Sequence, residues 1–486
     1  MDSIVASVRA NAFSQPDKTA VIANGEKITY KELWREIQGT AAFLRGYGFG
    51  PQSKIVVKVD QDIWFVVACF AIHLCGYIHV PMEKSIGVHG LEDVAGKLEA
   101  SMVISDIEPE GDFVSVHSGR IRGIAKEYYR DDLTFEMPGA DMICDILYTT
   151  GTTGKSKGVM LQHKAIVAVS ENVWYGANIK PDNVYLVPTP LNHAGAIRKI
   201  YVSMLTGTTV VLIDGFMDVK KFFSYIRDYG VTSIVLPPSA VRMLLVLSGK
   251  EFTKYADQLD HIHTGAAAFP EADKERLSAL LPNTHLYFAY GSSEAGCSCL
   301  YDYAEHKGKA SCVGKPNKNA EVFIVDDDGQ PVSATLENPG LIAVRGSMNM
   351  LGYYNEPELT AGTLRDGVVY TSDLGYIDEE GFLYVLGRRD DVINIGGLKI
   401  APTEVEAVVL RYPGIADCAC FAAQDRMGGA IPKLNIVPEK DQEINISDLK
   451  QFMANYLEAF KIPKTITVVE SIPKTYNGKT DRKKLK

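Results

Sequence analysis

The middle of the chain alternates between helical and strand-like hydrophobic spacing, and this alternation constrains the fold more than any other feature. Apolar residues recur at helical spacing from Phe216 to Ile226, and Val231 to Leu236 follows as a short apolar strand. The spacing predicts a second helix over Val241 to Leu247 with Ser239 as its N-cap, and a strand over His285 to Ala289. Strand, helix and strand in this order predict parallel βαβ units, with functional side chains in the loops at the strand ends.

Length and charge indicate a globular protein of more than one domain. At 486 residues the chain is longer than one hydrophobic core usually serves. Its formal net charge of -10 argues against a nucleic-acid or anionic-membrane partner. An anionic ligand would therefore have to meet local clusters of positive charge, and we expect no nucleic acid among the partners.

We expect a cytoplasmic protein without a membrane span. The N-terminus lacks the basic start and apolar core of a signal peptide. Trp64 to Met82 is the one stretch that could imitate a span, but His73, Gly76 and His79 interrupt it and Pro81 closes it. We interpret it as a buried helix that leads into a buried strand. The eight cysteines lack C-x-x-C spacing, which predicts buried free thiols rather than a zinc site.

Beyond Arg388 the pattern becomes that of a small α+β module. The spacing predicts a helix over 403–410, strands over 416–421 and 433–437, a helix over 448–460 capped by Ser447, and a strand over 465–469. We therefore expect two domains, one over residues 1–389 and one over residues 390–486.

One loop has the chemistry of a polyphosphate site. An apolar run leads into Thr149-Thr150-Gly151-Thr152-Thr153-Gly154-Lys155-Ser156-Lys157-Gly158, and apolar residues resume at Val159. The glycines let the backbone approach an anion, the threonine hydroxyls donate hydrogen bonds, and the lysines supply positive charge. The spacing is not that of the Walker loop. Because plain surface turns can have this composition, the other motifs of the chain decide its meaning.

Four further motifs follow in order. They are Tyr290-Gly291-Ser292-Ser293-Glu294, Tyr370-Thr371-Ser372-Asp373-Leu374-Gly375, Gly387-Arg388-Arg389-Asp390-Asp391, and Pro473-Lys474-Thr475-Tyr476-Asn477-Gly478-Lys479. With the loop they resemble the adenylate-forming superfamily, which includes acyl- and aryl-CoA synthetases, peptide-synthetase adenylation domains and luciferases. The acyl-CoA ligases are the most similar. The resemblance implies an α/β fold: a large N-terminal part, whose mixed and parallel sheets are flanked by helices, and a small mobile α+β C-terminal domain.

The resemblance also implies an ATP site in the N-terminal domain. The nucleotide would contact Thr149, Thr150, Gly151, Thr152, Thr153, Lys157, Gly265, Ala266, Tyr290, Gly291, Ser292, Ser293, Asp373 and Arg388. In this site Asp373 would bind the ribose hydroxyls, and Glu294 would hold Mg²⁺ on the phosphates. Acidic residues in turns are often merely solvated, so the match of the surrounding motifs favours these roles.

Lys479 is the implied catalytic residue. Adenylation brings two anions together, so positive charge is needed where the transition state is most negative. Lys479 would bridge the carboxylate and the α-phosphate from the mobile domain, on a long flexible stem. Asp390 would be the hinge of that domain, and Gly396 and Gly397 would shape the tunnel for the thiol. A solvated basic tail and ordinary tight turns are the alternatives.

The acid pocket is implied by Pro190-Leu191-Asn192-His193-Ala194-Gly195, which resembles a segment of acyl- and aryl-CoA synthetases. The residues expected to line the pocket are His193, Ala194, Gly195 and Ala267, and His193 is also a catalytic candidate. The amino-acid-activating members of the superfamily carry an Asp in this segment, whereas this chain has no Asp between Pro188 and Ile213. We therefore expect an acid without an α-amino group, mostly apolar and uncharged beyond its carboxylate.

Two cations follow the pocket segment. Arg198 and Lys199 are unusual there, and we expect them to be exposed residues of a helix. A preference for dicarboxylic acids would instead make both of them site residues.

The function implied is that of an AMP-forming acid:CoA ligase, which uses ATP, Mg²⁺, a small carboxylic acid and CoA. A freestanding adenylation enzyme that loads an acyl or aryl acid onto carrier-protein phosphopantetheine is the alternative, because the chain ends at the lysine loop. A luciferase-like monooxygenase has no positive support in the sequence. A non-catalytic nucleotide-binding relative is disfavoured by Glu294, Asp373 and Lys479 together.

Overall fold

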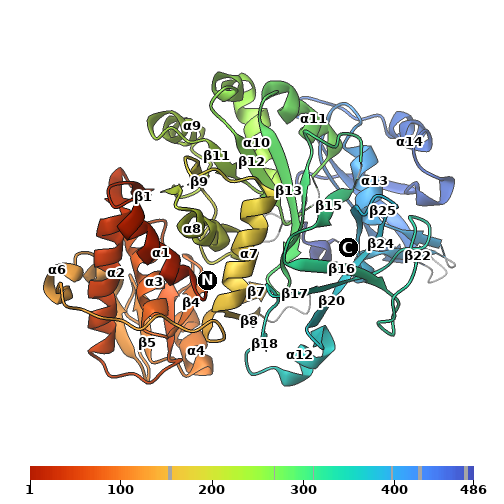
Figure 1. Ribbon diagram of the computed structural model, residues 1–486. Coiled ribbons are helices and arrows are strands. Elements are labelled where there is room, and N and C mark those ends of the chain that lie inside the picture. Colours follow the sequence, from red (N-terminus) through yellow and green to blue (C-terminus); the bar gives the residue numbers. More distant parts are fainter. Residues whose placement is uncertain are drawn as a thin grey trace.

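The computed structural model describes residues 1–150, 156–267, 269–309, 311–395, 398–424, 430–474 and 480–485. Two large sheets with their helices form most of the molecule, and a smaller C-terminal part lies beside the second sheet (Figure 1). The N-terminal segments, in red and orange, lie on the opposite side from the C-terminal segments, in blue.

The first sheet has seven strands in the order β18-β8-β7-β4-β3-β5-β6. Their bounds are β3 (Lys54–Lys58), β4 (Ile78–Met82), β5 (Met102–Ser105), β6 (Val114–His117), β7 (Ile143–Thr150), β8 (Ser156–Gln162) and β18 (Gly352–Tyr353). The helices of this part are α1 (Ile4–Ser14), α2 (Tyr30–Arg45), α3 (Ile63–Leu74), α4 (Val88–Leu98), α5 (Ser118–Ile121) and α6 (Ala125–Tyr128). Strands β3 to β7 pair in parallel, while β7, β8 and β18 pair antiparallel.

Helix α3 is buried on all sides. The Asp62 side chain caps it by accepting a hydrogen bond from the Trp64 backbone, and every residue from Trp64 to Leu74 is buried. A helix that is apolar all round belongs in a protein core or a membrane. Here it leads into the buried strand β4, which confirms the interpretation of residues 64–82. Among the described helices, none combines the length and the apolar character that a membrane crossing requires.

The second sheet has fourteen strands. Thirteen follow the order β16 (Ala320–Val325), β17 (Gly340–Gly346), β20 (Val368–Ile377), β21 (Leu383–Arg388), β15 (Cys312–Pro316), β14 (Gly296–Asp302), β13 (His285–Ser292), β12 (His261–Gly265), β11 (Ser233–Val235), β9 (Val184–Val187), β10 (Thr209–Leu212), β1 (Thr19–Ala23) and β2 (Glu26–Thr29), and β19 (Leu364–Arg365) pairs with β20. The strands from β1 to β13 in this order pair in parallel. The expected βαβ units are therefore confirmed.

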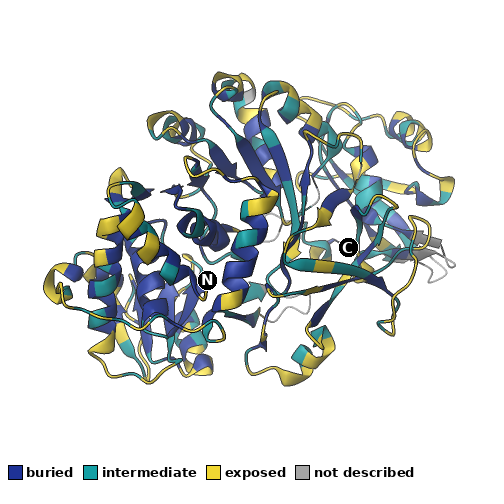
Figure 2. Cartoon of the chain, in the orientation of Figure 1, coloured by how far each residue is buried: buried dark blue, intermediate teal, exposed yellow. Residues whose placement is uncertain are grey.

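The helices of this region are α7 (His163–Gly176), α8 (Ala194–Thr206), α9 (Val219–Asp228), α10 (Pro238–Ser248), α11 (Glu271–Leu280) and α12 (Pro357–Thr363), with a 3₁₀ helix η1 (Gly249–Tyr255). Helix α8 is dark blue, and so buried, along most of its length (Figure 2). The N-cap predicted at Ser239 is wrong, because α10 begins one residue earlier at Pro238. Proline suits a first helical position, since its ring fixes φ and it lacks an N–H that would go unpaired there.

The C-terminal part has its own apolar core. Its elements are η2 (Arg389–Asp391), β22 (Ile393–Ile395), β23 (Leu398–Ile400), α13 (Pro402–Val409), β24 (Ile415–Gln424), β25 (Ala430–Pro438), α14 (Ile446–Ala454), η3 (Ala459–Lys461), β26 (Thr465–Val468) and η4 (Arg482–Lys484). Buried residues from Ile393 to Leu457 form one cluster. The cap predicted at Ser447 is wrong: Asn445 caps α14 by accepting from two backbone N–H groups, and the helix ends at Ala454 rather than at residue 460.

All eight cysteines are free thiols, as expected, and all but the half-buried Cys75 are buried.

Candidate active site

Three residues predicted to bind nucleotide meet near the ends of β13 and β21 and at the middle of β20. Asp373 of β20 lies opposite Arg388 of β21 in the sheet register. The Tyr290 hydroxyl donates a 2.8 Å hydrogen bond to Asp373 Oδ2, and Arg388 Nε lies 3.5 Å from Asp373 Oδ1. Burial, with the Asp373 charge as a second cause, raises the pKa of Tyr290. Tyr290 is therefore a fixed neutral donor that orients the carboxylate of Asp373.

A second group joins the two large sheets. Glu294 lies in the turn between β13 and β14, and its Oε1 accepts a 2.8 Å hydrogen bond from the Tyr353 hydroxyl of β18. The Lys157 ammonium lies 5.5 Å from the centroid of the Tyr353 ring, a distance at which cation and ring attract. No sequence pattern points to Tyr353, because a tyrosine near the end of a short strand has no recognisable signal of its own.

Glu294 fits a magnesium ligand. Carboxylate oxygens are the protein ligands that Mg²⁺ prefers. Within the described part of the chain, Oε1 accepts from Tyr353 and Oε2 accepts no hydrogen bond. One carboxylate oxygen therefore remains available to a cation.

The predicted phosphate loop is carried by the hairpin of β7 and β8. Thr149 pairs with Lys157 and Thr150 with Ser156 across it. Gly151, Thr152 and Thr153 lie outside the described residues, and so does the side chain of Thr150. At Gly158 an added Cβ would lie 2.8 Å from a methyl carbon of Ile146, so the close approach at the base of the hairpin requires glycine.

The ends of β12 and β13 are tightly packed. An added Cβ on Gly265 would lie 2.6 Å from the Ala289 carbonyl oxygen, and one on Gly291 would lie 1.9 Å from the Gly296 carbonyl oxygen. Ala266 has φ +68°, a left-handed conformation that an alanine rarely adopts. Ala267 follows it. The strain at Ala266 turns the chain sharply at the place where the sequence predicts nucleotide and acid contacts.

His193, Ala194 and Gly195 form the start of α8. His193 takes the N-cap position, and around Gly195 no heavy atom lies within 4 Å of an added Cβ among the described residues. The segment predicted to line the acid pocket therefore borders open space at Gly195.

Arg198 and Lys199 are buried, so the prediction that they are exposed is wrong. Arg198 is 8% exposed and donates to the backbone carbonyl oxygens of Ser292 and Ser293 at 3.0 and 3.1 Å. Lys199 is 3% exposed and its ammonium lies 2.7 Å from His263 Nδ1. Arg198 thereby fixes the turn that carries Glu294.

The C-terminal residues of the predicted site are described only in part. Asp390 is exposed in η2. Gly396, Gly397 and Lys479 lie outside the described residues. The two ends of the 475–479 segment are tied together, because Lys474 and Thr480 form an isolated β-bridge and the Asp481 N–H donates to the Pro473 carbonyl at 2.8 Å.

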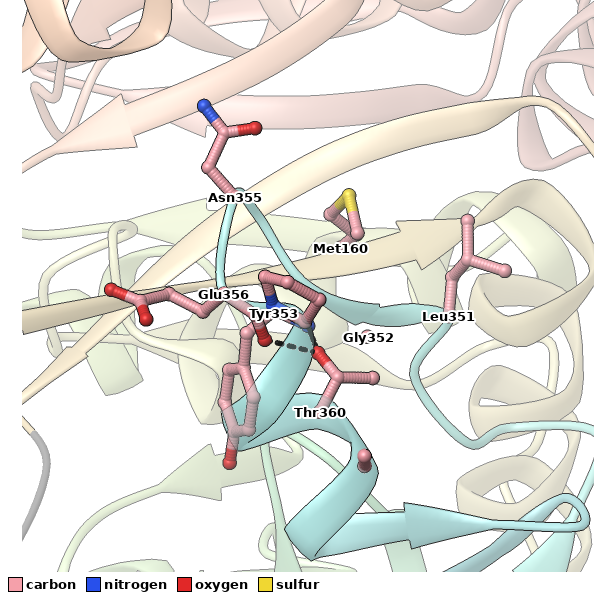
Figure 3. Close-up of a pocket in the computed structure, with 9 residues that line it drawn as sticks. Met160, Leu351, Gly352, Tyr353, Asn355, Glu356 and Thr360 are labelled. Carbon is pink, nitrogen blue, oxygen red and sulfur yellow. Dashed lines mark hydrogen bonds between the residues drawn. The ribbon is translucent and has the colours of Figure 1, made fainter.

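Tyr353 also belongs to the lining of a hollow of about 430 Å³, whose residues are drawn in Figure 3. The hollow is lined by Met160, Leu351, Gly352, Tyr353, Asn355, Glu356, Pro357, Thr360 and Ala361. The Thr360 hydroxyl joins its walls by donating to the Glu356 carbonyl and accepting from the Tyr353 N–H. Tyr353 links this hollow to the predicted site through its contacts with Glu294 and Lys157.

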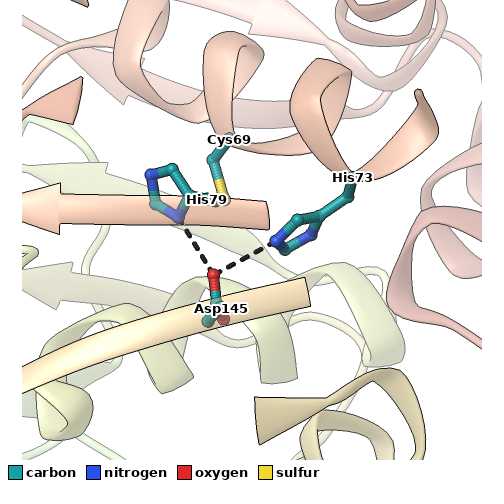
Figure 4. A group of neighbouring side chains, drawn as sticks. All are labelled: Cys69, His73, His79 and Asp145. Carbon is teal, nitrogen blue, oxygen red and sulfur yellow. Dashed lines mark hydrogen bonds and ion pairs between the residues drawn. The ribbon is translucent and has the colours of Figure 1, made fainter. Parts of the chain in front are cut away.

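A buried polar network lies beneath α8. Asp145 of β7 accepts at Oδ1 from His73 of α3 and His79 of β4, at 3.1 and 3.0 Å (Figure 4), and at Oδ2 from the Tyr201 hydroxyl of α8 at 2.7 Å. Burial alone would raise the pKa of Asp145, but the two histidines hold that pKa well below its usual range. Cys69 adds a fourth metal-ligating atom within 4.8 Å of the others. Three donors already satisfy the carboxylate, so the network has a structural role and holds α3, β4, β7 and α8 together.

Two family models match the chain: the AMP-binding enzyme model over residues 8–354 and the model of the AMP-binding enzyme C-terminal domain over residues 404–479. A feruloyl-CoA synthase of Amycolatopsis sp is 30% identical over 473 residues, 96% of this chain and 94% of the relative. A 2-succinylbenzoate–CoA ligase of Bacillus cereus is 27% identical over 479 residues, 98% of this chain and 96% of the relative. The structure of o-succinylbenzoate CoA synthetase from Bacillus subtilis, in complex with its acyl-adenylate intermediate, matches with TM-score 0.86 at 25% identity and covers 99% of this chain and 97% of that chain.

Proposed function

The chain belongs to the AMP-binding enzyme family, and from this membership we propose how its own residues carry out the reaction of an AMP-forming acid–CoA ligase. The reaction uses ATP, Mg²⁺, a carboxylic acid and CoA. A carboxylate oxygen attacks the α-phosphorus of ATP, and the bond to pyrophosphate breaks. The thiolate of CoA then attacks the acyl carbon, the bond to AMP breaks, and the thiol proton is released to solvent.

The observation that carries the assignment is the contact of Tyr353 with both Glu294 and Lys157. It brings a cation from the β7–β8 hairpin and a carboxylate from the β13–β14 turn to one place, although they belong to different sheets. Lys157 would contact phosphate oxygens, together with the loop residues Thr149 to Thr153. Glu294 would hold Mg²⁺, which when bound neutralises phosphate charge.

Asp373 and Arg388 would bind the ribose. Tyr290 occupies one side of the Asp373 carboxylate, so the Oδ1 side, near Arg388, is the side available to ribose hydroxyls. The adenine would lie against Gly265, Ala266 and the segment from Tyr290 to Ser293. The tight packing of β12 against β13 supports this, because it holds both strand ends rigid.

The acid would enter beside His193, Ala194, Gly195 and Ala267. The open space at Gly195 supports this position. The absence of an Asp in the segment before Ile213 supports an acid without an α-amino group.

Residues 1–389 and 390–486 would act as two domains. Lys479 would reach the α-phosphate from the second domain, Asp390 would be the pivot between them, and Gly396 and Gly397 would line the entry of the thiol. The exposure of Asp390 supports a pivot, since packed side chains do not restrain it. CoA is the acceptor, and a cytoplasmic location is part of the proposal.

The test is a pyrophosphate-release screen over aliphatic, aryl and dicarboxylic acids, followed by measurement of AMP release with CoA or with a phosphopantetheinylated carrier protein. We expect acid-dependent release of pyrophosphate and CoA-dependent release of AMP. Release of AMP with the carrier protein and not with CoA would instead support the adenylation enzyme that loads a carrier. Absence of acid-dependent pyrophosphate release would refute the proposal.

A further inference from the structure

Helix α8 carries two basic side chains, Arg198 and Lys199, that lie in the protein interior. Arg198 and Lys199 are at least nine-tenths buried. Removing a charge from water is costly unless the charge is paired and hydrogen-bonded. Within the described residues, neither side chain forms an ion pair with a carboxylate. Arg198 meets two carbonyl oxygens, and its Nε has no partner in that part of the chain.

The neighbouring groups do not compensate this charge. The partner of Lys199 is His263, a base, and burial with the nearby lysine lowers the pKa of His263 well below its usual range. The carboxylates whose charge reaches Arg198 are Glu294 and Asp145. Glu294 accepts from Tyr353, and both oxygens of Asp145 are already occupied. The described part of the chain therefore leaves a buried positive region without a counter-ion.

The region adjoins the predicted acid pocket. Lys199 follows His193 on the same helix, at a rise of roughly 9 Å for six residues. His263 lies on β12 just before Thr264 and Gly265. The Thr264 hydroxyl is buried and has no hydrogen-bond partner among the described residues. Lys199, His263 and Thr264 thus lie beside the segments predicted to line the pocket, and none of them has a described carboxylate partner.

We propose that the acid substrate carries a second carboxylate, which Lys199 binds at the end of the pocket away from the reacting carboxylate. Arg198 adds long-range attraction, and His263 and Thr264 supply further polar contacts. This inference rests on the proposed position of the acid beside His193.

The protonation of Lys199 agrees with this role. Burial lowers the pKa of Lys199 to about 7. Burial makes protonation of Lys199 unfavourable when the pocket is empty. An anion bound beside Lys199 makes the protonated form favourable, so the pocket selects acids by charge as well as by shape.

The experiment compares dicarboxylic acids, aromatic and aliphatic, with their monomethyl esters, by measuring kcat/KM for pyrophosphate release. The ester removes one charge at nearly constant length. We expect the wild type to prefer each accepted diacid over its ester, and Lys199→Met to lower kcat/KM for the diacid by about 30- to 4000-fold, the range for truncating one partner of a buried charge pair. The loss for the ester should be at least about tenfold smaller, since its second group carries no charge to pair.

Two further variants protect the result from misinterpretation. Lys199→Arg keeps the charge and should retain more of the diacid preference than Lys199→Met. Lys164→Met removes an exposed lysine on the neighbouring helix α7 and should leave the preference unchanged. KM for ATP and the melting temperature report whether Lys199→Met has damaged the nucleotide site or the fold.

Equal losses for diacid and ester in Lys199→Met would overturn the inference. So would a wild type that accepts only monocarboxylic acids, a result that leaves the proposed ligase function intact. Failure of every acid to release pyrophosphate would instead count against the proposed function itself.

Discussion

Tyr353 donates a 2.8 Å hydrogen bond to Glu294 across the boundary between the two large sheets. The same ring lies 5.5 Å from the Lys157 ammonium. One tyrosine thus sets the relative positions of a cation and a carboxylate that come from motifs far apart in the sequence.

Glu294→Gln should raise the Mg²⁺ concentration for half-maximal pyrophosphate release by roughly tenfold and slow adenylation. Glutamine keeps the shape and the bond from Tyr353 but removes the charge. Tyr353→Phe is the matched control, because it leaves the carboxylate in place and should shift the requirement less. An unchanged Mg²⁺ dependence in folded Glu294→Gln would remove Glu294 from the metal site.

Lys479→Ala should lower acyl-AMP formation by about 100- to 1000-fold, which is the scale for losing one transition-state charge contact. Attack of CoA on supplied acyl-AMP should change far less, because that step needs no clamp on the α-phosphate. Lys484→Ala tests the alternative of a solvated basic tail and should have no effect on either step. Normal pyrophosphate exchange in Lys479→Ala would show that this lysine is not catalytic.

Asp390→Pro should retain adenylation and lose thioester formation. Proline fixes φ at Asp390 and restricts Arg389 before it, so one arrangement of the two domains is frozen. Asp390→Ala removes the same side chain without fixing φ and should keep both steps. The measurement is pyrophosphate exchange and CoA-dependent AMP release on the same preparations. Equal loss of both activities in Asp390→Pro would point to misfolding or to a different pivot.

His163 should make the fold acid-sensitive. Burial lowers the pKa of His163 to about 3, whereas the unfolded chain takes up the proton near its ordinary pKa of about 6.5. Between these values the unfolded state binds more protons, so stability falls as the pH drops through that window. His163→Gln should therefore reduce the loss in unfolding free energy between pH 7.5 and 5.5 by about 1.4 kcal/mol, as measured by urea denaturation. An unchanged pH dependence in the variant would contradict the assignment.

The sequence predicts well those features that depend on neighbours along the chain. The parallel βαβ units, the buried stretch from residue 64 to residue 82 and most strands of the C-terminal part follow from hydrophobic spacing. The first residue of a helix is harder to predict. Pro238 and Ser239 are neighbours and both suit a helix start, and the same is true of the nearby residues Asn445 and Ser447.

Contacts between segments that are distant in sequence cannot be predicted from hydrophobic spacing. Arg198 and Lys199 look like surface residues in sequence, and only their neighbours in space make them interior ones. The same holds for Asp145, whose donors His73 and Tyr201 lie 72 and 56 residues away. A buried polar network is visible only when the chain has folded.

Arg198 has a consequence for anyone who wishes to redirect this enzyme to new acids. Its guanidinium grips the backbone of Ser292 and Ser293, so a substitution chosen to reshape the pocket also loosens the peptide beside Glu294. A substitution at position 198 would therefore lower the turnover number even if it broadened the set of accepted acids. Within the described part of the chain, the side chains of Lys199 and His263 contact each other and hold no backbone carbonyl near Glu294, so substitutions at these two positions should change acid selectivity with less effect on the metal site.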